Sequence, residues 1–412
     1  MAFAINLRCL DCGEVLPLAY TYKCPKCEGA LDVIYDYERL LEVKDCLSFL
    51  AKVGPGLTRY FPFLPLEAPE AMITLGEGGT QLLPVENIHL RANLPRLYLK
   101  NESTNPTGSF KDRPLSISVS RAKESGLETI VIASSGNAGA AAAAYAARGG
   151  LRCVVLIPAK TPAAKIAQTT AYGAKVVRVN GSFSDCFQLA KHASQTQGCA
   201  NVTTTYLNPF NLEGDKTLAF EVFTQLGLLV PDCLIIPIGA GPLLAGIHKG
   251  FRELRDLGLC NKIPRLVGVQ AEGCAPIVKA FAAGRKQAEA WGDAKTVASA
   301  IADPLHGYER DATYTLKCIR DSKGRAVAVS DEETLEACSE LARYEGLFLE
   351  PTAATTLAAV RKLTREGWLH EENTVILVLT GHGLKDPLNS SRQTGETPVI
   401  EPSLQQLESI LL

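Results

Sequence analysis

The sequence lacks an excess of charge of either sign. Its 42 lysines and arginines stand against 44 aspartates and glutamates, so the 412 residues carry a net charge of −2. Since there is no compact basic cluster either, we expect no nucleic acid and no anionic membrane as a partner. No apolar run reaches the roughly 18 residues of a membrane span, and the N-terminus shows no signal-peptide pattern. These absences favour a globular, cytoplasmic protein.

The pattern of a disulfide framework is also missing, although the chain has 13 cysteines. Cys9 and Cys12 form one Cys-x-x-Cys pair and Cys24 and Cys27 form another, with 11 residues between the pairs. Two such pairs present four thiolates in a tetrahedron, which suits Zn²⁺. We predict a structural zinc site, because four protein ligands leave no open position for catalysis. The alternative is a small β module with reduced thiols and no metal.

Short runs rich in β-branched residues recur along the chain, with helical patterns between them. The runs are 129–133, 153–157, 175–179, 201–205, 233–238, 266–269 and 375–379. Strands so continuously apolar are typical of parallel sheets covered on both faces, which predicts an α/β fold. A capping box at Ser330 and Glu333 predicts a helix to about Glu345, and Asp215 is expected to cap a helix through Leu226.

Lys111 stands out in the string Asn105-Pro-Thr-Gly-Ser-Phe-Lys-Asp-Arg113, where a turn precedes a predicted helix. The positive end of a helix dipole opposes the charged form of a lysine. A neutral amine is what Schiff-base chemistry requires. Taken alone, such a residue is more often an ordinary solvated lysine.

Two strand-to-helix turns are candidate anion sites. Ser134, Ser135 and Asn137 follow the run 129–133, and the glycine-rich segment 239–246 follows the run 233–238. Backbone N–H groups at such turns point toward an anion, although Gly and Asn also suit turns without a ligand. Thr380 is expected at the carboxyl end of the last strand, where ligands gather in open α/β sheets. His382, beside it, is a candidate acid or base, or a simple turn residue.

In this order, these pieces resemble the fold type II pyridoxal-phosphate (PLP) enzymes, the tryptophan synthase β-like group, and among them the threonine synthases. The resemblance extends from Leu75-Gly-Glu-Gly-Gly-Thr80 to Asp386, and it is most specific around Lys111 and in Thr380-Gly-His-Gly-Leu-Lys-Asp386. It implies PLP as the cofactor, a lyase that acts on a small amino acid, and a homodimer.

The resemblance also implies a role for individual residues. Lys111 holds the cofactor as a Schiff base and later moves protons, while Phe110 packs beside the ring and Asn137 binds its phenolic oxygen. Thr380 faces the pyridine nitrogen. The implied cradle for the cofactor phosphate is Gly239, Ala240, Gly241, Pro242 and Leu243. The implied site for the substrate carboxylate is Ser134, Ser135, Asn137 and Ala138.

The implied architecture is two doubly wound α/β domains with mostly parallel sheets, plus a small N-terminal four-cysteine module resembling a zinc ribbon. We expect the module at 1–40 and a large PLP-binding domain made of 41–111 and 206–390. A small substrate domain is expected at 112–205, and a C-terminal tail at 391–412.

Threonine synthesis from O-phosphohomoserine and water is the leading functional hypothesis. Three departures from the threonine synthase pattern leave the substrate open. Asn211 stands where an Arg is usual, Ala138 stands where a Thr is usual, and the phosphate cradle is closer to that of serine and threonine dehydratases. Arg113, Lys165 and Lys216 are candidate partners for a substrate phosphate. The alternatives are a serine/threonine ammonia-lyase, a β-replacement synthase with another substrate, and a non-catalytic regulatory paralogue.

Overall fold

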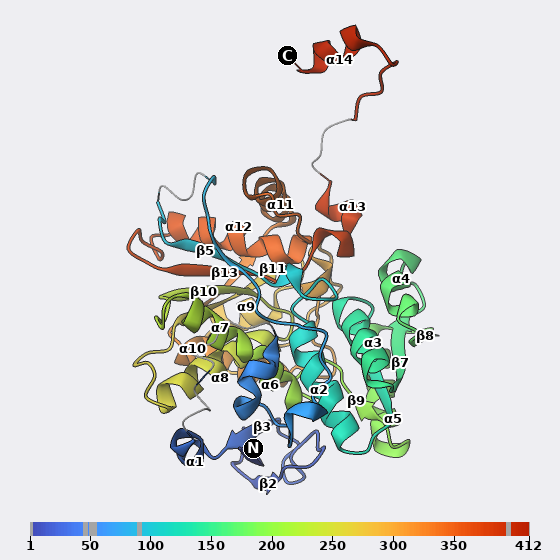
Figure 1. The fold of residues 1–412 in the computed structure, drawn as a ribbon, viewed down its shortest axis with the longest axis vertical. Coiled ribbons are helices and arrows are strands. Elements are labelled where there is room, and N and C mark those ends of the chain that lie inside the picture. The colour runs from blue at the N-terminus through green and yellow to red at the C-terminus, as the bar shows by residue number, and fades with distance from the viewer. Residues whose placement is uncertain (1–2, 44–47, 49–55, 89–92, 393–396, 412) are drawn as a thin grey trace.

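A six-stranded sheet is the centre of the larger part of the molecule (Figure 1). This computed structural model describes all residues except 1–2, 44–47, 49–55, 89–92, 393–396 and 412. The strand order is β12-β11-β10-β13-β5-β4, and all neighbours are parallel except the edge pair β4 and β5. The strands are β12 (Arg325–Val329), β11 (Arg265–Ala271), β10 (Cys233–Pro237), β13 (Val375–Leu379), β5 (Leu97–Asn101) and β4 (Leu82–Pro84). The central strands β10 and β13 are buried along their whole length, as their unbroken apolar sequences predict.

Helices cover both faces of this sheet. α12 (Pro351–Arg365) lies across one face, with α11 (Asp331–Glu345) packed against its outer side (Figure 1). The opposite face is covered by α8 (Pro242–Asp256), α9 (Pro276–Ala282) and α10 (Asp311–Asp321). Two further helices, α6 (Phe210–Asp215) and α7 (Thr217–Gln225), pack on α8.

A second sheet of four parallel strands lies beside the first, in the order β8-β7-β6-β9. Its strands are β6 (Thr129–Ala133), β7 (Arg152–Pro158), β8 (Lys175–Val179) and β9 (Ala200–Asn201). α3 (Asn137–Gly149) packs on this sheet and on α2 (Asp112–Glu124), and its alanines combine high helix propensity with the small size that close packing needs. α4 (Ala163–Ala171) and α5 (Phe183–Thr196) complete this unit.

The first residues form a three-stranded antiparallel sheet, β2-β1-β3, followed by the short helix α1 (Tyr37–Glu42). The strands are β1 (Ala4–Cys9), β2 (Val15–Pro17) and β3 (Leu31–Tyr35). Polar side chains join this module to the main body. Lys249 of α8 forms a salt bridge with Asp32 at 2.5 Å, and the Tyr35 hydroxyl donates to Glu213 of α6 at 2.6 Å. The module therefore contacts the helices that cover the large sheet.

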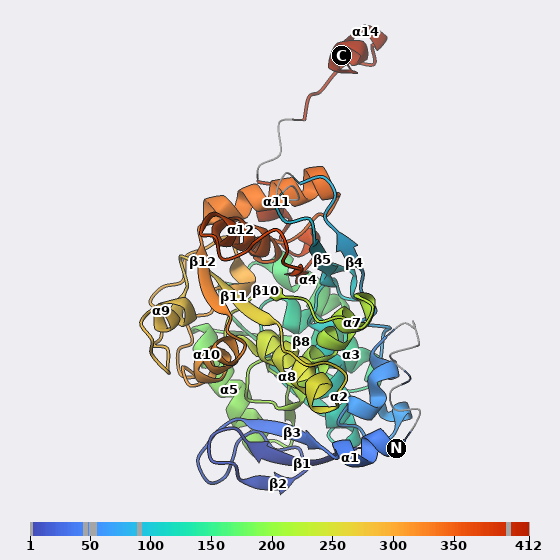
Figure 2. The same cartoon turned by 90° about the vertical axis from the view of Figure 1, so that its left-hand side faces the viewer.

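The chain ends with the short helices α13 (Pro387–Ser390) and α14 (Leu404–Leu411), and α14 projects from the main body (Figure 2). Short 3₁₀ segments lie at Leu57–Phe63, Pro69–Ala71, Glu102–Thr104, Ser299–Ile301 and Gly383–Lys385. In the part of the chain that the structure describes, no helix has the length and apolar character needed to cross a membrane.

Two local predictions were wrong. The expected strand 201–205 ends at Asn201, because the Asn201 side chain accepts a hydrogen bond from the Thr203 backbone at 2.9 Å and turns the chain away from the sheet. Asp215 does not cap the following helix, because α6 continues through it and Lys216 occupies the N-cap position of α7. The capping box at Ser330 and Glu333 is present, and it opens α11 as predicted.

Candidate active site

Lys111 lies at the N-cap position of α2, so the predicted turn does deliver this lysine to the start of a helix. Its Nζ atom donates to the Thr204 hydroxyl at 2.8 Å and lies 4.5 Å from the centre of the Phe110 ring. Burial lowers the pKa of the Lys111 amine, because desolvation disfavours its charged form. The position therefore favours the neutral amine.

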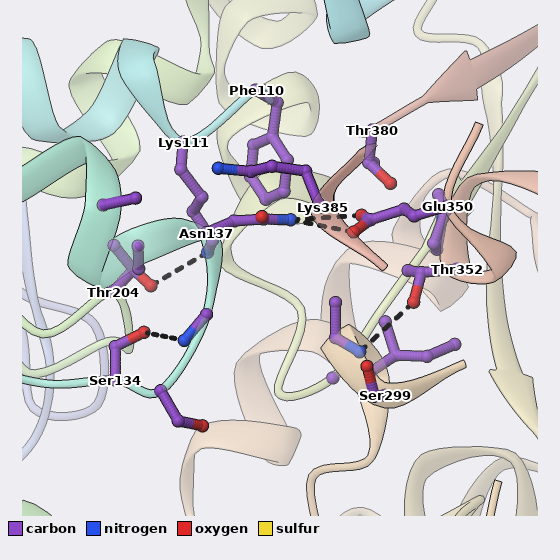
Figure 3. Close-up of a pocket in the computed structure, with 18 of the residues that line it drawn as sticks. Phe110, Lys111, Ser134, Asn137, Thr204, Ser299, Glu350, Thr352, Thr380 and Lys385 are labelled. Carbon is purple, nitrogen blue, oxygen red and sulfur yellow. Dashed lines mark hydrogen bonds between the residues drawn. The ribbon is translucent and has the colours of Figure 1, made fainter. Parts of the chain in front are cut away.

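The Ser134–Ala138 turn follows β6 and opens α3, facing the same space as Lys111 (Figure 3). The Ser134 hydroxyl accepts from the backbone N–H groups of Gly136 at 3.3 Å and Gly139 at 3.1 Å. The N–H groups of Asn137 and Ala138 belong to the first helical turn, where backbone donors have no intrahelical partner. These two donors are the ones suited to a carboxylate.

The glycine-rich segment 239–243 follows β10 and opens α8. Gly241 has φ +97°, a left-handed conformation, and an added Cβ there would lie 2.4 Å from Thr315. Glycine is therefore required both for the turn and for the close approach of α10. Behind the segment, the Thr315 hydroxyl donates to the Ala240 carbonyl at 2.5 Å and fixes its backbone.

Thr380 follows β13 directly, at the same edge of the large sheet. Its hydroxyl is buried and has no hydrogen-bond partner among the described residues. Since unsatisfied buried hydroxyls are rare, this one is free to bind a ligand. His382 serves the turn instead: its Nδ1 accepts from the Leu384 backbone at 3.1 Å.

Lys111, the Ser134–Ala138 turn, the segment 239–243 and Thr380 line a single cavity of about 800 Å³. The cavity brings together all residues predicted to bind the cofactor or the substrate carboxylate: Phe110, Lys111, Ser134, Ser135, Asn137, Ala138, Gly239, Ala240, Gly241, Pro242, Leu243 and Thr380. Its walls come from the carboxyl ends of β6, β10 and β13, where ligands gather in open α/β sheets.

Residues 73–381 match the family of pyridoxal-phosphate dependent enzymes. The chain belongs to this family. It is 40% identical to the threonine synthase of Methanocaldococcus jannaschii over 98% of both chains, and 38% identical to that of Methanosarcina acetivorans, also over 98% of both. Among solved structures, a threonine deaminase from T.th. has a TM-score of 0.61 at 25% identity, covering 77% of this chain and 94% of that one. The fold is thus that of the fold type II PLP enzymes.

The cavity fits the cofactor of this family. An amine with a lowered pKa, a hydroxyl without a partner among the described residues, and a glycine-rich turn at a helix N-terminus line the same cavity. These groups match the aldehyde, the ring nitrogen and the phosphate of PLP, respectively.

Glu350 and Lys385 also line the cavity, and no sequence pattern had singled them out. Asn137 donates to both carboxylate oxygens of Glu350 at 3.1 Å, which fixes the orientation of the amide (Figure 3). Burial raises the pKa of Glu350 and lowers the pKa of Lys385. The only sequence signal for Lys385 is its place in the motif that begins with Thr380.

Asp303 is a third residue that was missed, and it packs against the start of the glycine-rich segment. An added Cβ at Gly239 would lie 3.1 Å from the Asp303 side chain. The Tyr308 hydroxyl donates to its carboxylate at 2.5 Å, and burial raises the pKa of the carboxyl group. This shift disfavours a second negative charge beside a candidate anion site.

The structure separates the candidate partners of a substrate phosphate. Arg113 is fully buried and pairs with Glu102 at 2.7 Å and Glu221 at 2.8 Å, and Lys216 is buried against other carboxylates. Neither lines the cavity, whereas Lys165 does. Asn211 also lies outside the cavity, where it accepts a hydrogen bond from Ser118 of α2 at 2.6 Å. The replacement of the usual Arg by Asn211 therefore does not change the lining of the cavity in this chain.

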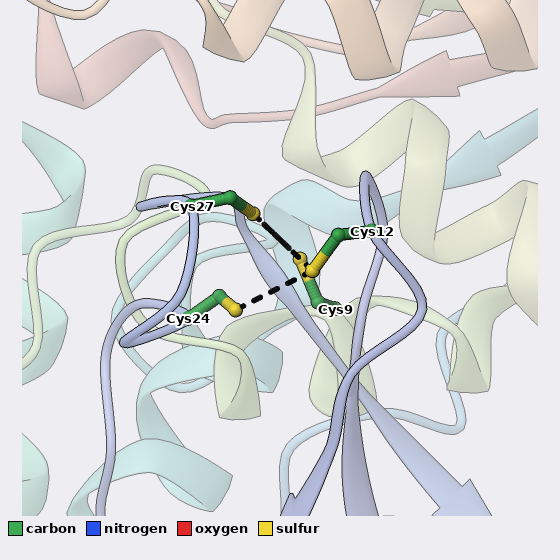
Figure 4. Close-up of side chains that lie close together, drawn as sticks. All are labelled: Cys9, Cys12, Cys24 and Cys27. Atoms are coloured by element: carbon green, nitrogen blue, oxygen red, sulfur yellow. Dashed lines mark hydrogen bonds between the residues drawn. The ribbon is translucent and has the colours of Figure 1, made fainter.

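The predicted metal ligands meet in the N-terminal module (Figure 4). The Sγ atoms of Cys9, Cys12, Cys24 and Cys27 all lie within 4.8 Å of one another. Four thiols converging from two turns fit a tetrahedral metal site.

Proposed function

We propose that this chain is a PLP-dependent threonine synthase, a lyase that converts O-phosphohomoserine and water into threonine and phosphate. The carrying observation is one cavity lined by Lys111, by the Ser134–Ala138 turn and by two further lysines, Lys165 and Lys385. The threonine synthase relatives that match almost the whole chain support the same assignment.

Each group of the cofactor has a proposed partner. Lys111 holds its aldehyde carbon covalently, Phe110 packs beside its ring, and Thr380 meets the ring nitrogen. The segment Gly239–Leu243 binds its phosphate, and Asn137, oriented by Glu350, meets its phenolic oxygen. When bound, PLP supplies an electron sink for negative charge at the α-carbon of an amino acid.

Lys111 is the proposed proton carrier of the reaction. Its neutral amine would take the α-proton of the substrate and later return a proton to the substrate skeleton. Thr204 accepts from Nζ at 2.8 Å and so keeps the amine in the cavity. Burial supports this role because it holds the pKa of the amine below that of an ordinary lysine.

Two groups of residues that line the cavity are proposed to recognise the substrate. The backbone donors of Asn137 and Ala138, with Ser134 and Ser135 around them, receive the substrate carboxylate. Lys165 and Lys385 receive the leaving phosphate, since a phosphate dianion in an enclosed site needs cationic partners. Burial raises the pKa of Asp303 beside the cradle, which disfavours a second negative charge next to the cofactor phosphate.

The test is product release by the reconstituted chain. The proposal expects phosphate and threonine from O-phosphohomoserine, with little 2-oxobutyrate from threonine. If only 2-oxobutyrate forms, the chain is an ammonia-lyase. If neither forms while the cofactor binds, the chain is a β-replacement synthase with another substrate or a non-catalytic paralogue. Both results contradict the proposal.

We also propose that Cys9, Cys12, Cys24 and Cys27 hold one structural Zn²⁺. Metal analysis of purified chain tests this: about one zinc per chain is expected, and a Cys12→Ser variant is expected to lose it. A homodimer, a cytoplasmic location and the division into the domains given above are proposals of the same standing. Sedimentation of the purified chain tests the dimer.

A further inference from the structure

The cysteine cluster is tied to a helix of the main body by side chains of its own loop. Asp11 lies between two of the cysteines in sequence, and its carboxylate accepts from the Tyr314 hydroxyl of α10 at 2.8 Å. It also pairs with Arg310, whose guanidinium donates to the Cys27 carbonyl at 2.9 Å. The Ala30 backbone, just after the second cysteine pair, donates to the Tyr314 hydroxyl at 3.0 Å. Tyr314 thus bonds both loops that carry the cysteines.

The next residue of the same helix holds the proposed phosphate cradle. The Thr315 hydroxyl donates to the Ala240 carbonyl at 2.5 Å and shares a hydrogen bond with Tyr206 at 2.8 Å. Gly241 approaches the same side chain so closely that no Cβ fits between them. A shift of α10 would therefore move the backbone that is to bind the cofactor phosphate.

We infer that the four-cysteine metal site and the cofactor site are energetically coupled through Tyr314 and Thr315 of α10. Metal in the cysteine cluster fixes the loops that carry Asp11 and Ala30, these loops fix α10, and α10 fixes the cradle at Ala240 and Gly241. The inference rests on the proposed metal and cofactor sites and adds a regulatory link between them. Coupling of this kind is reciprocal, so each ligand must tighten the other by the same factor.

The experiment measures both affinities on the full chain under reducing conditions. The Kd for PLP is titrated with zinc bound and after chelation, and the Kd for Zn²⁺ is measured by chelator competition with and without PLP. We expect each ligand to tighten the other by about fivefold or more, with equal factors. Tyr314→Phe keeps the ring but removes the hydroxyl, and it should lower both factors, while the Arg310 contacts with Asp11 and Cys27 remain.

Two sets of control variants distinguish coupling through α10 from a nonspecific loss of stability. Tyr98→Phe on β5, at the other end of the molecule from the module (Figure 1), should keep the wild-type factor. Thr315→Val should abolish the coupling by removing the donor to Ala240, and Thr315→Ser should retain it. If chelation unfolds the module, the deciding result is a weaker Kd for PLP in zinc-bound Tyr314→Phe than in the zinc-bound wild type.

Equal PLP affinity with and without bound zinc would overturn the inference, as would a cluster that binds no metal. So would a factor that Tyr314→Phe leaves unchanged. These outcomes are distinct from failure of the proposed activity, because the coupling is read from binding. Phosphate release from O-phosphohomoserine is read from catalysis.

Discussion

Removing the positive charge of Lys385 tests the recognition of a phosphorylated substrate. Lys385 lines the cavity and contacts Gln168, so a Lys385→Met substitution keeps much of the side-chain volume while it deletes the cation. A hydrogen bond to a charged group contributes about 1.5–3 kcal/mol, or roughly 10–150-fold in kcat/KM. Because Lys385 is partly exposed and already has a partner, we expect the lower end, about tenfold.

The assay is phosphate release from O-phosphohomoserine over a range of substrate concentrations. The Ki of inorganic phosphate as an inhibitor should rise with the loss in kcat/KM, while cofactor absorbance stays unchanged. Lys160→Met is the matched control, because Lys160 is exposed and does not line the cavity. Lys385→Arg should restore much of the activity.

The pH dependence has a defined sign. Burial lowers the pKa of Lys385, so its charge is lost at a lower pH than that of an ordinary lysine. The kcat/KM for the phosphorylated substrate should fall as the pH rises through this lowered pKa, and less so in Lys385→Arg. Wild-type kinetics in Lys385→Met would refute this account of the phosphate site.

Three further predictions concern the cofactor and stability. Thr380→Val should weaken PLP binding about tenfold without lowering the free energy of unfolding, because the hydroxyl has no protein partner among the described residues; equal PLP affinity in a titration would contradict it. Arg113→Met should cost about 3–5 kcal/mol in urea unfolding, because it leaves buried carboxylates unpaired, whereas the exposed Arg325→Met should cost about 1 kcal/mol or less. Burial lowers the pKa of His248 to about 4, so the unfolded state binds the proton more readily, and stability should fall as the pH drops from about 6.5 toward 4. His248→Asn should flatten that fall in an unfolding series, and an unchanged slope would contradict the assignment.

The cavity was largely predictable from local sequence, because most of the segments proposed to bind the cofactor are turns directly after an apolar strand. The turn at Asn137, the segment at Gly239 and Thr380 all follow this rule, and parallel strands bring such turns to one edge of a sheet. The strands 129–133, 175–179 and 375–379 were predicted to the residue for the same reason.

Residues whose importance depends on long-range packing could not be predicted. Glu350 follows a half-buried segment and precedes a proline, and only the fold brings it to Asn137, 213 positions away. The strands β5 and β12, near the two edges of the large sheet, were missed because flanking polar residues interrupt their apolar runs. Asn211 was noted on sequence grounds as a departure that leaves the substrate open, whereas the structure places it outside the cavity, bonded to Ser118 of α2.

The central claim is a covalent link between Lys111 and the cofactor, and borohydride reduction followed by peptide mass spectrometry tests it most directly. Treating the PLP-loaded chain with borohydride should fix a pyridoxyl group on the peptide that contains Lys111. Lys111→Ala should show neither the modified peptide nor phosphate release. Modification of another lysine in place of Lys111, or full turnover by Lys111→Ala, would contradict the account.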